Sequence, residues 1–204
     1  MENRICTILG IEKPVIQGPM VYLTDAKLVA TVSNAGGLGS LGPHAGQVDS
    51  TKDPIERAER LRAQIKQVKQ LTDKPFSVNV LPSQHHEDND LYTPPQLDVI
   101  FEEEVPVVTF VGEPNKSMIR MFGQFKERGI KIVYRSLNPT PENTRAAEEA
   151  GADIIVATGF DEGDTLHLRQ SFSQTRNATR MPATTPATAT ILPAMQRKSG
   201  FRST

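Results

Sequence analysis

The 204-residue chain contains one cysteine, Cys6, and no tryptophan. A single cysteine excludes an internal disulfide framework and fits a reducing compartment, so we expect a cytoplasmic protein in which Cys6 is a small buried residue. No stretch approaches the roughly 20 apolar residues that span a bilayer. The first ten residues also lack the basic and apolar regions of a secretory signal. We therefore expect no membrane partner.

Acidic residues are absent after Asp164. All 24 Asp and Glu residues precede this point, whereas the last 40 residues carry six of the 23 Lys and Arg residues. The overall net charge of -1 gives no reason to expect a nucleic acid partner. Segment 165–204 is also rich in Thr and has no repeating apolar pattern. It predicts a disordered basic tail of low complexity that follows one domain over residues 1–164.

Short apolar runs alternate with helix-like segments up to Asp164. Each run ends in a loop rich in Gly, Pro or Asn. The runs that we interpret as strands are Val15–Gly18, Leu38–Gly42, Phe76–Leu81, Val105–Gly112, Lys131–Leu137 and Ala152–Gly159. This alternation predicts an α/β fold with a parallel sheet, either doubly wound or a (β/α)8 barrel. In both architectures ligands bind at the carboxyl ends of the strands.

Capping residues mark where the helices between these strands begin. Thr24 is expected to cap a helix over Asp25–Asn34, and Asp53-Pro54, Asn115 and Thr140-Pro141 are expected to open three others. The polar segment 85–96, which includes Pro94-Pro95, is interpreted as a surface loop, followed by a short helix over Leu97–Glu104.

Two patterns that suggest common sites are interpreted as structural. Segment Gly37–Gly42 matches G-x-G-x-x-G, but it follows a helix and forms a strand, which is the wrong context for a dinucleotide site. We expect it to let backbone segments pack closely. His85 and His86 are adjacent in a polar loop and have no third ligand at metal spacing, so no metal site is predicted. His44, after the second strand, is a weak acid/base candidate.

Three groups of residues at strand ends are open to two interpretations. Gly18-Pro19-Met20 either turns backbone amides toward a ligand or forms an ordinary turn. Asn79, a polar residue within a strand, either binds a heterocycle or makes a structural hydrogen bond. Asp161 and Glu162 either act in acid/base chemistry or favour a helix start.

Four motifs occur in one order along the chain: Pro14–Met20, Ser33–Gly39, Lys74–Val80 and Glu149–Asp153. Together they resemble the nitronate monooxygenase family, also called the 2-nitropropane dioxygenase family, which is related to FMN-dependent enoyl-ACP reductases. The resemblance runs from about Arg4 to Gly163.

The resemblance implies a TIM-type barrel with FMN at the carboxyl ends of its strands and oxidation of alkyl nitronates by O2. It places flavin contacts on Gly18, Pro19, Met20 and Asn79, and on Asp161 and Gly163. Thr165 stands where the family often has a catalytic His, so the catalytic residue is unknown. Asp164 replaces a glycine of the family pattern.

About six βα units are expected, because a complete barrel takes roughly 250 residues. The resemblance places the FMN phosphate in loops after strands seven and eight, so FMN binding is expected to be weakened or lost. Exposed sheet edges would then favour self-association. We hypothesise that the tail is a frameshifted translation, an idea that fails if a one-base shift of the gene does not restore a Gly-rich seventh strand.

Three alternatives remain. One is an inactive fragment or interaction module without flavin. Another is an NAD(P)H-dependent flavin reductase or enoyl-ACP reductase. A third is a different phosphate-binding barrel enzyme, such as a lyase or dehydrogenase.

Overall fold

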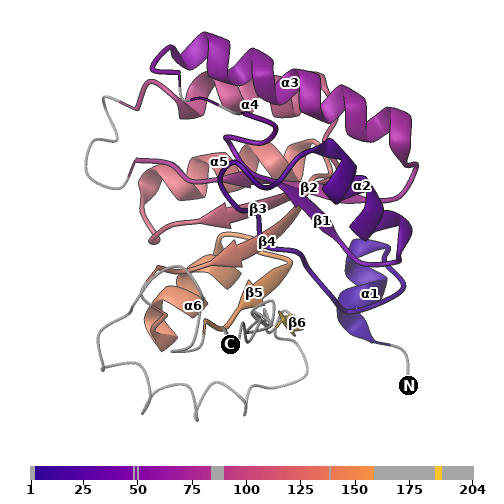
Figure 1. Ribbon diagram of the computed structural model, residues 1–204. Helices are drawn as coiled ribbons and strands as arrows, with labels where there is room; N and C mark the ends of the chain where they lie inside the picture. Colours follow the sequence, from indigo (N-terminus) through magenta and orange to yellow (C-terminus); the bar gives the residue numbers. More distant parts are fainter. Residues whose placement is uncertain are drawn as a thin grey trace, which may run out of the picture.

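The computed structural model describes residues 3–47, 49, 51–83, 90–137, 139–158 and the backbone of 187–189. Its strands form one parallel sheet in sequential order, β1-β2-β3-β4-β5-β6 (Figure 1). The strands are β1 Gly39–Leu41, β2 Phe76–Val80, β3 Val107–Val111, β4 Lys131–Arg135, β5 Ile154–Val156 and β6 Ala187–Ala189. The helices are α1 Arg4–Leu9, α2 Ala26–Asn34, α3 Pro54–Leu71, α4 Thr93–Glu102, α5 Lys116–Glu127 and α6 Pro141–Glu149. The predicted α/β class and parallel sheet are confirmed.

Five of the six predicted strands form as expected, and the first is much shorter than predicted. In Val15–Gly18 only Ile16 makes a bridge, to Leu38, supported by hydrogen bonds from Gln17 N to Leu38 O and from Leu38 N to Val15 O. Pro14 and Pro19 flank the segment, and proline cannot donate to a strand ladder. Val15 remains 56% exposed, so this segment lies at an edge of the described sheet.

The start of two helices differs from the prediction. Asp25, not Thr24, caps α2, since its side chain accepts a hydrogen bond from Leu28 N. Thr24 instead accepts one from Met20 N. Helix α4 begins at Thr93, so Pro94-Pro95 belong to its first turn and not to a loop. Proline is tolerated there because the first helical N–H groups have no intrahelical partner.

The short helix α1 was not predicted, although its caps are present in the sequence. The Asn3 side chain accepts a hydrogen bond from Ile5 N at the start, and Gly10 adopts a left-handed conformation with φ 68 at the end. Asparagine and glycine are favoured at these two positions. Six residues are too few to show a helical period, so the spacing of apolar residues did not predict this helix.

The two faces of the sheet are buried by different helices. On the outer face, alternate residues such as Val78, Phe110 and Tyr134 pack beneath α2 to α6 in the larger cluster of buried side chains. On the inner face, Val107, Val133 and Ile154 pack with Ile5 and Leu9 of α1. Val107 and Ile154 are the first residues of β3 and β5. Helix α1 therefore packs against the inner face of the sheet.

Three residues of the predicted tail have strand backbone. Ala187–Ala189 pair with β5 in parallel, with Ile154 opposite Ala187 and Val156 opposite Ala189. The prediction of a tail without regular structure therefore does not hold for these three residues. The rest of 165–204 lies outside the described residues.

Candidate active site at the carboxyl edge of the sheet

The inner face of the sheet is polar on β1 and β2 and apolar on β4 and β5. Cross-strand partners place Ser40 beside Ser77, and Asn79 beside Thr109. Ser77 Oγ donates to Gly39 O at 3.5 Å, and Thr109 Oγ1 donates to Ser77 Oγ at 3.2 Å. Side chains on one face of a strand recur every second residue, so these groups share the face of Val107 and Val133. The polar part of the inner face therefore spans β1, β2 and β3.

Four buried polar atoms on this side of the molecule have no hydrogen-bond partner among the described residues. They are Ser40 Oγ, Gln47 Oε1, Asn79 Oδ1 and Thr158 Oγ1. Ser40 is 0% exposed and Thr158 is 7% exposed. Buried polar atoms nearly always have a partner, because an unpaired one loses its hydration without compensation. Ser40 is the middle residue of β1, Asn79 lies near the carboxyl end of β2, and Gln47 and Thr158 follow β1 and β5. A bound ligand could satisfy these atoms.

The predicted loop Gly18-Pro19-Met20 is held at the end of β1. Gln17 Oε1 accepts a hydrogen bond from Ser40 N at 3.0 Å, while Gln17 Nε2 donates to Gly18 O at 2.6 Å. A Cβ atom at Gly42 would lie 3.1 Å from Pro19 Cβ, so the chain after β1 approaches the loop closely. The structure thus places this loop beside β1, while Asn79 lies on the adjacent strand β2.

The loop continues into a run of exposed apolar side chains. Met20, Val21, Tyr22 and Leu23 are 45%, 57%, 54% and 70% exposed. Tyr22 has a φ of 63, a left-handed backbone conformation that is unusual for an aromatic residue. Strained, exposed residues at the carboxyl end of a sheet are typical of ligand or partner contacts.

The loops after β3 and β4 are tied together by a carboxylate. Glu113 accepts hydrogen bonds from Ser136 Oγ at 3.0 and 3.2 Å, and one from Asn143 Nδ2 of α6. Tyr134 OH donates to Gly112 O at 3.0 Å. Burial raises the pKa of Tyr134 well above its usual range, so its hydroxyl stays protonated near neutral pH. These contacts fix the shape of the edge.

The remaining predicted residues fall into two groups. His44 follows β1 and is half-buried, and its pKa is lowered by burial and by the charge of Arg57. It is therefore neutral at physiological pH, which leaves it available as a proton acceptor. Asp161, Gly163 and Thr165, together with Glu162, His85 and His86, lie outside the described residues.

The sequence analysis did not identify Ser40 and Thr158 as candidate site residues. For Ser40, the surrounding motif explains why. Ser40 lies inside the G-x-G-x-x-G segment, which was interpreted only as a packing motif. That interpretation is correct for Gly39, because a Cβ atom there would lie 2.3 Å from Val29 O of α2. Side chains alternate between the two faces of a strand, and this alternation could have assigned the Ser40 side chain to the inner face. Only the folded chain shows that the Ser40 hydroxyl has no hydrogen-bond partner.

Within the described part of the chain, no group of three or more His, Cys, Asp or Glu side chains is arranged to hold a metal ion. None of the described helices is long and apolar enough to cross a membrane.

Comparison with known proteins bears on the chemistry of this edge. The family model for nitronate monooxygenase matches residues 2–182. The chain belongs to the nitronate monooxygenase family. The match extends beyond Gly163, so the predicted end of the resemblance was too early.

Curated relatives agree with the family match. A nitronate monooxygenase of Paraburkholderia phytofirmans is 33% identical over 195 residues, covering 79% of this chain and 49% of the relative. A probable nitronate monooxygenase of Staphylococcus aureus is 33% identical over 213 residues, covering 90% of this chain and 55% of the relative. The chain therefore spans about half the length of the relatives it matches.

Solved structures identify the architecture. FabK from Thermotoga maritima is 29% identical with a TM-score of 0.67, over 88% of this chain and 51% of that chain. Nitroalkane oxidase from Streptomyces ansochromogenes is 25% identical with a TM-score of 0.59, over 77% of this chain and 48% of that chain. Both are TIM-type barrels, so the predicted fold class is confirmed and β1 to β6 form part of such a barrel.

Proposed function

We propose that this chain is the flavin-binding part of an FMN-dependent oxidoreductase that oxidises alkyl nitronates with O2. The observation that carries the proposal is the set of unpartnered polar atoms on the inner face, at the edge where barrel enzymes bind ligands. Membership of the nitronate monooxygenase family supports the choice of chemistry.

The residues present fit a flavin ring. Asn79 Oδ1 is a buried acceptor suited to a ring N–H, and Ser40 and Thr158 offer hydroxyls that can donate or accept. We assign contacts with the ring to Gly18, Pro19, Met20 and Asn79, and by resemblance to Asp161 and Gly163. FMN, when bound, would supply the redox chemistry.

The chain's own residues would orient the cofactor and exclude water. Gln17 ties Gly18 to β1 through its two amide hydrogen bonds, which orient the turn toward the end of the strand. The buried apolar side chains below it, from Leu38 to Ile154, keep the floor of the site dry. Rigid, dry surroundings strengthen hydrogen bonds to a ligand. No catalytic residue is assigned, since Thr165 is not a base near neutral pH.

The test measures FMN binding to the 204-residue protein through the change in flavin fluorescence. We expect Asn79→Ala and Ser40→Ala each to weaken binding about tenfold, the effect of one lost buried hydrogen bond. The exposed Gln67→Ala variant on α3 is the matched control and should bind like the wild type. Oxygen uptake with an alkyl nitronate then tests turnover. Because the chain spans about half the length of its relatives, we expect weak FMN binding by the wild type, measured at high FMN concentration. Equal FMN binding by Asn79→Ala, Ser40→Ala and Gln67→Ala would contradict the proposal.

Reduction of the flavin by NAD(P)H is a different activity of the same site. Mixing the FMN-loaded protein with NADPH in the absence of O2 distinguishes NAD(P)H-dependent flavin reduction from nitronate oxidation. Bleaching of the flavin absorbance supports a reductase, and an unchanged spectrum supports nitronate as the only reductant.

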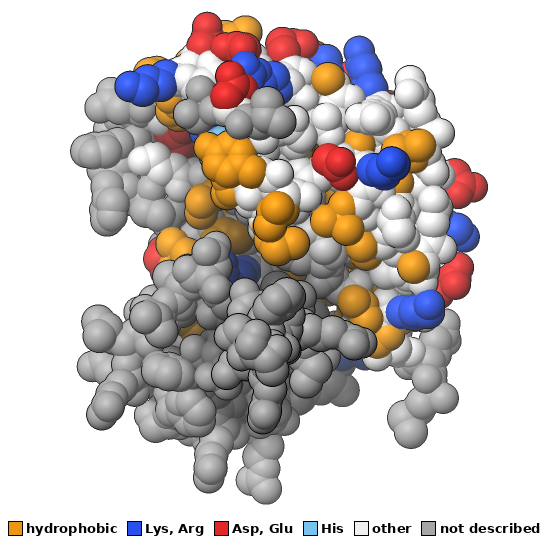
Figure 2. Space-filling model, viewed as in Figure 1, with side chains coloured by type: hydrophobic (Ala, Val, Ile, Leu, Met, Phe, Trp, Pro, Cys, Tyr) orange, Lys and Arg blue, Asp and Glu red, His pale blue; other side chains and the backbone are white. Residues whose placement is uncertain are grey.

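A second candidate function is an interaction module without flavin. The observation that favours it is the exposed apolar run Val21–Leu23, which follows the short edge segment at Ile16 in the chain. Several exposed apolar side chains are visible together on the surface in Figure 2. We propose that this region mediates self-association. Light scattering at increasing protein concentration tests it, with Leu23→Ser expected to shift the distribution toward monomer.

Localisation in the cytoplasm remains part of the proposal. It is supported by the single cysteine, which fits a reducing compartment.

A further inference from the structure

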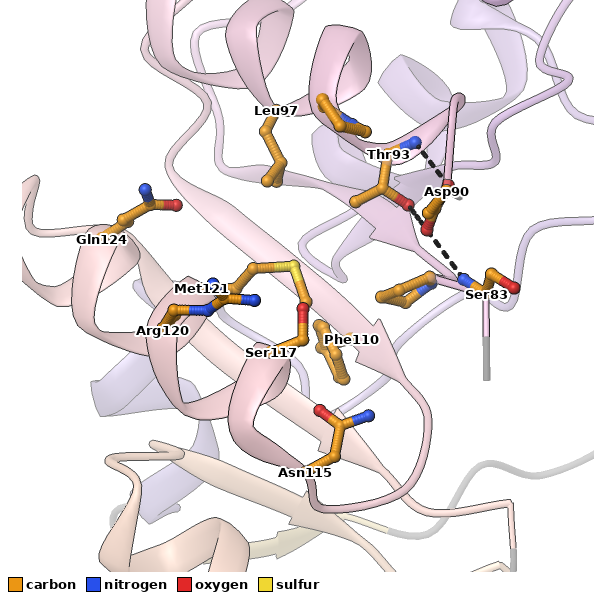
Figure 3. Close-up of a pocket in the computed structure, with 12 residues that line it drawn as sticks. Ser83, Asp90, Thr93, Leu97, Phe110, Asn115, Ser117, Arg120, Met121 and Gln124 are labelled. Atoms are coloured by element: carbon orange, nitrogen blue, oxygen red, sulfur yellow. Dashed lines mark hydrogen bonds between the residues drawn. The ribbon is translucent and has the colours of Figure 1, made fainter. Parts of the chain in front are cut away.

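A cavity opens between α4 and α5 on the outer face of the sheet, separate from the inner-face site. Its volume is about 280 Å³, and Figure 3 shows the residues around it. The lining residues are Pro82, Ser83, Asp90, Thr93, Pro94, Leu97, Phe110, Asn115, Ser117, Arg120, Met121 and Gln124. Phe110 belongs to the outer-face cluster of buried side chains, so a ligand here would lie on the opposite side of β3 from Thr109.

Aromatic side chains join the two helices near one end of each. Near their carboxyl ends, Phe101 of α4 and Phe125 of α5 pack with ring centroids 5.9 Å apart, and Arg128 lies 4.2 Å over the Phe101 ring. Pro94 near the amino end of α4 and Ser117 near the amino end of α5 line the cavity.

The wall formed by α5 carries a cation and further hydrogen-bond donors. Within the described part of the chain, neither Arg120 nor Ser117 has a side-chain hydrogen bond or ion pair. They are three residues apart on α5, and in Figure 3 they point toward the same space. Gln124, one turn after Arg120, lines the same wall. This wall can therefore bind an anionic group.

The opposite wall carries a carboxylate that is already fully bonded. Asp90 accepts hydrogen bonds from Ser83 N at 2.8 Å, Tyr92 N at 3.1 Å, Thr93 N at 3.0 Å and Thr93 Oγ1 at 2.6 Å. Burial raises the pKa of Asp90, but these hydrogen bonds outweigh it and hold the pKa below its usual value. Asp90 stays ionised and would repel an anion placed near it. The anionic group of a ligand is thus directed to the α5 wall.

The floor between the two walls is apolar. Phe110 is 1% exposed and Met121 is 6% exposed, and Leu97 packs against the same cluster. An aromatic or aliphatic body fits this floor, where an aromatic ring can contact Phe110 and the Met121 sulfur. We infer that the cavity binds a small organic carboxylate, with its anionic group at Arg120 and Ser117 and its apolar body on Phe110 and Met121.

Benzoate is the probe, and isothermal calorimetry on the 204-residue protein measures its binding. Benzamide, which has the same shape without the charge, is expected to bind at least tenfold more weakly. Arg120→Gln should weaken benzoate binding about tenfold, as expected for one lost charge-assisted hydrogen bond. Arg145→Gln, an exposed arginine on α6 that does not line the cavity, is the matched control and should bind like the wild type.

A second variant tests the cavity without altering its charge. Leu97→Trp should fill the floor and abolish benzoate binding, and an unchanged unfolding midpoint in urea would show that the variant is folded. The inference is overturned if benzoate does not bind, if benzamide binds equally well, or if Arg120→Gln and Arg145→Gln behave alike. Flavin binding at the inner face is not needed for any of these outcomes, so the proposed function can fail independently.

Discussion

Gly39 lies at the point where α2 passes closest to the sheet. A Cβ atom at this position would be 2.3 Å from Val29 O and 2.9 Å from Val29 C, well inside van der Waals contact. Both atoms belong to a helix backbone, which cannot move aside as a flexible side chain would. The glycine is therefore required by packing, in agreement with the interpretation of its motif as structural.

We predict that Gly39→Ala destabilises the protein by about 2–3 kcal/mol, because the helix must shift away from β1. Gly123→Ala is the matched control. Gly123 lies inside α5 with nothing within 4 Å of a Cβ atom, so alanine should stabilise the helix by up to about 1 kcal/mol. Urea unfolding midpoints of the two variants should move in opposite directions. Equal midpoints would contradict the close approach of α2.

At the scale of elements, sequence signals were reliable where a cap and a helical period coincide. Asn115 and Thr140 cap α5 and α6 as predicted, with their side chains accepting hydrogen bonds from Met118 N and Asn143 N. The predicted start of α4 was wrong because a polar segment that contains prolines resembles a loop. Only the hydrogen bonds that Asp90 accepts from Tyr92 N and Thr93 N show that the helix begins there.

Helix α3 offers a direct test of capping. The Asp53 side chain accepts hydrogen bonds from Ile55 N at 2.8 Å and Glu56 N at 3.2 Å. We predict that Asp53→Ala lowers the free energy of unfolding by about 1 kcal/mol, while Asp53→Asn retains most of the stability. Asp73→Ala, at an exposed position after the same helix, should have little effect. If Asp53→Ala and Asp73→Ala unfold at the same urea concentration, the cap does not contribute.

At the scale of the whole molecule, the sheet separates two groups of buried side chains. The larger group lies under α2 to α6, and the smaller one joins α1 to the inner face. In Figure 1, α1 lies at the right of the view beneath α2, near the amino-terminus and away from α3 to α5. This short helix thus stabilises the face that carries the candidate site.

Leu9 tests the contribution of α1 to the whole fold. It is 3% exposed and packs in the inner cluster with Leu38, Val107 and Ile154. We predict that Leu9→Ala costs about 2–4 kcal/mol, from lost burial and the cavity left behind. The same substitution at Leu91, which is 67% exposed, should cost less than about 0.5 kcal/mol. Similar thermal unfolding temperatures for the two variants would show that α1 is not part of the core.

The sequence by itself determined the α/β alternation, most helix starts, the family and the expectation that ligands bind at the carboxyl edge. Each of these depends on residues close together in the chain, whose spacing reports which side is buried and where backbone donors need a cap. The tertiary structure alone decided that Ser40, Asn79 and Thr158 carry unpartnered polar atoms, that α1 packs on the inner face, and that residues of α4 and α5 line a common cavity. These depend on contacts between residues far apart in sequence, because the satisfaction of a buried polar atom is set by every element around it.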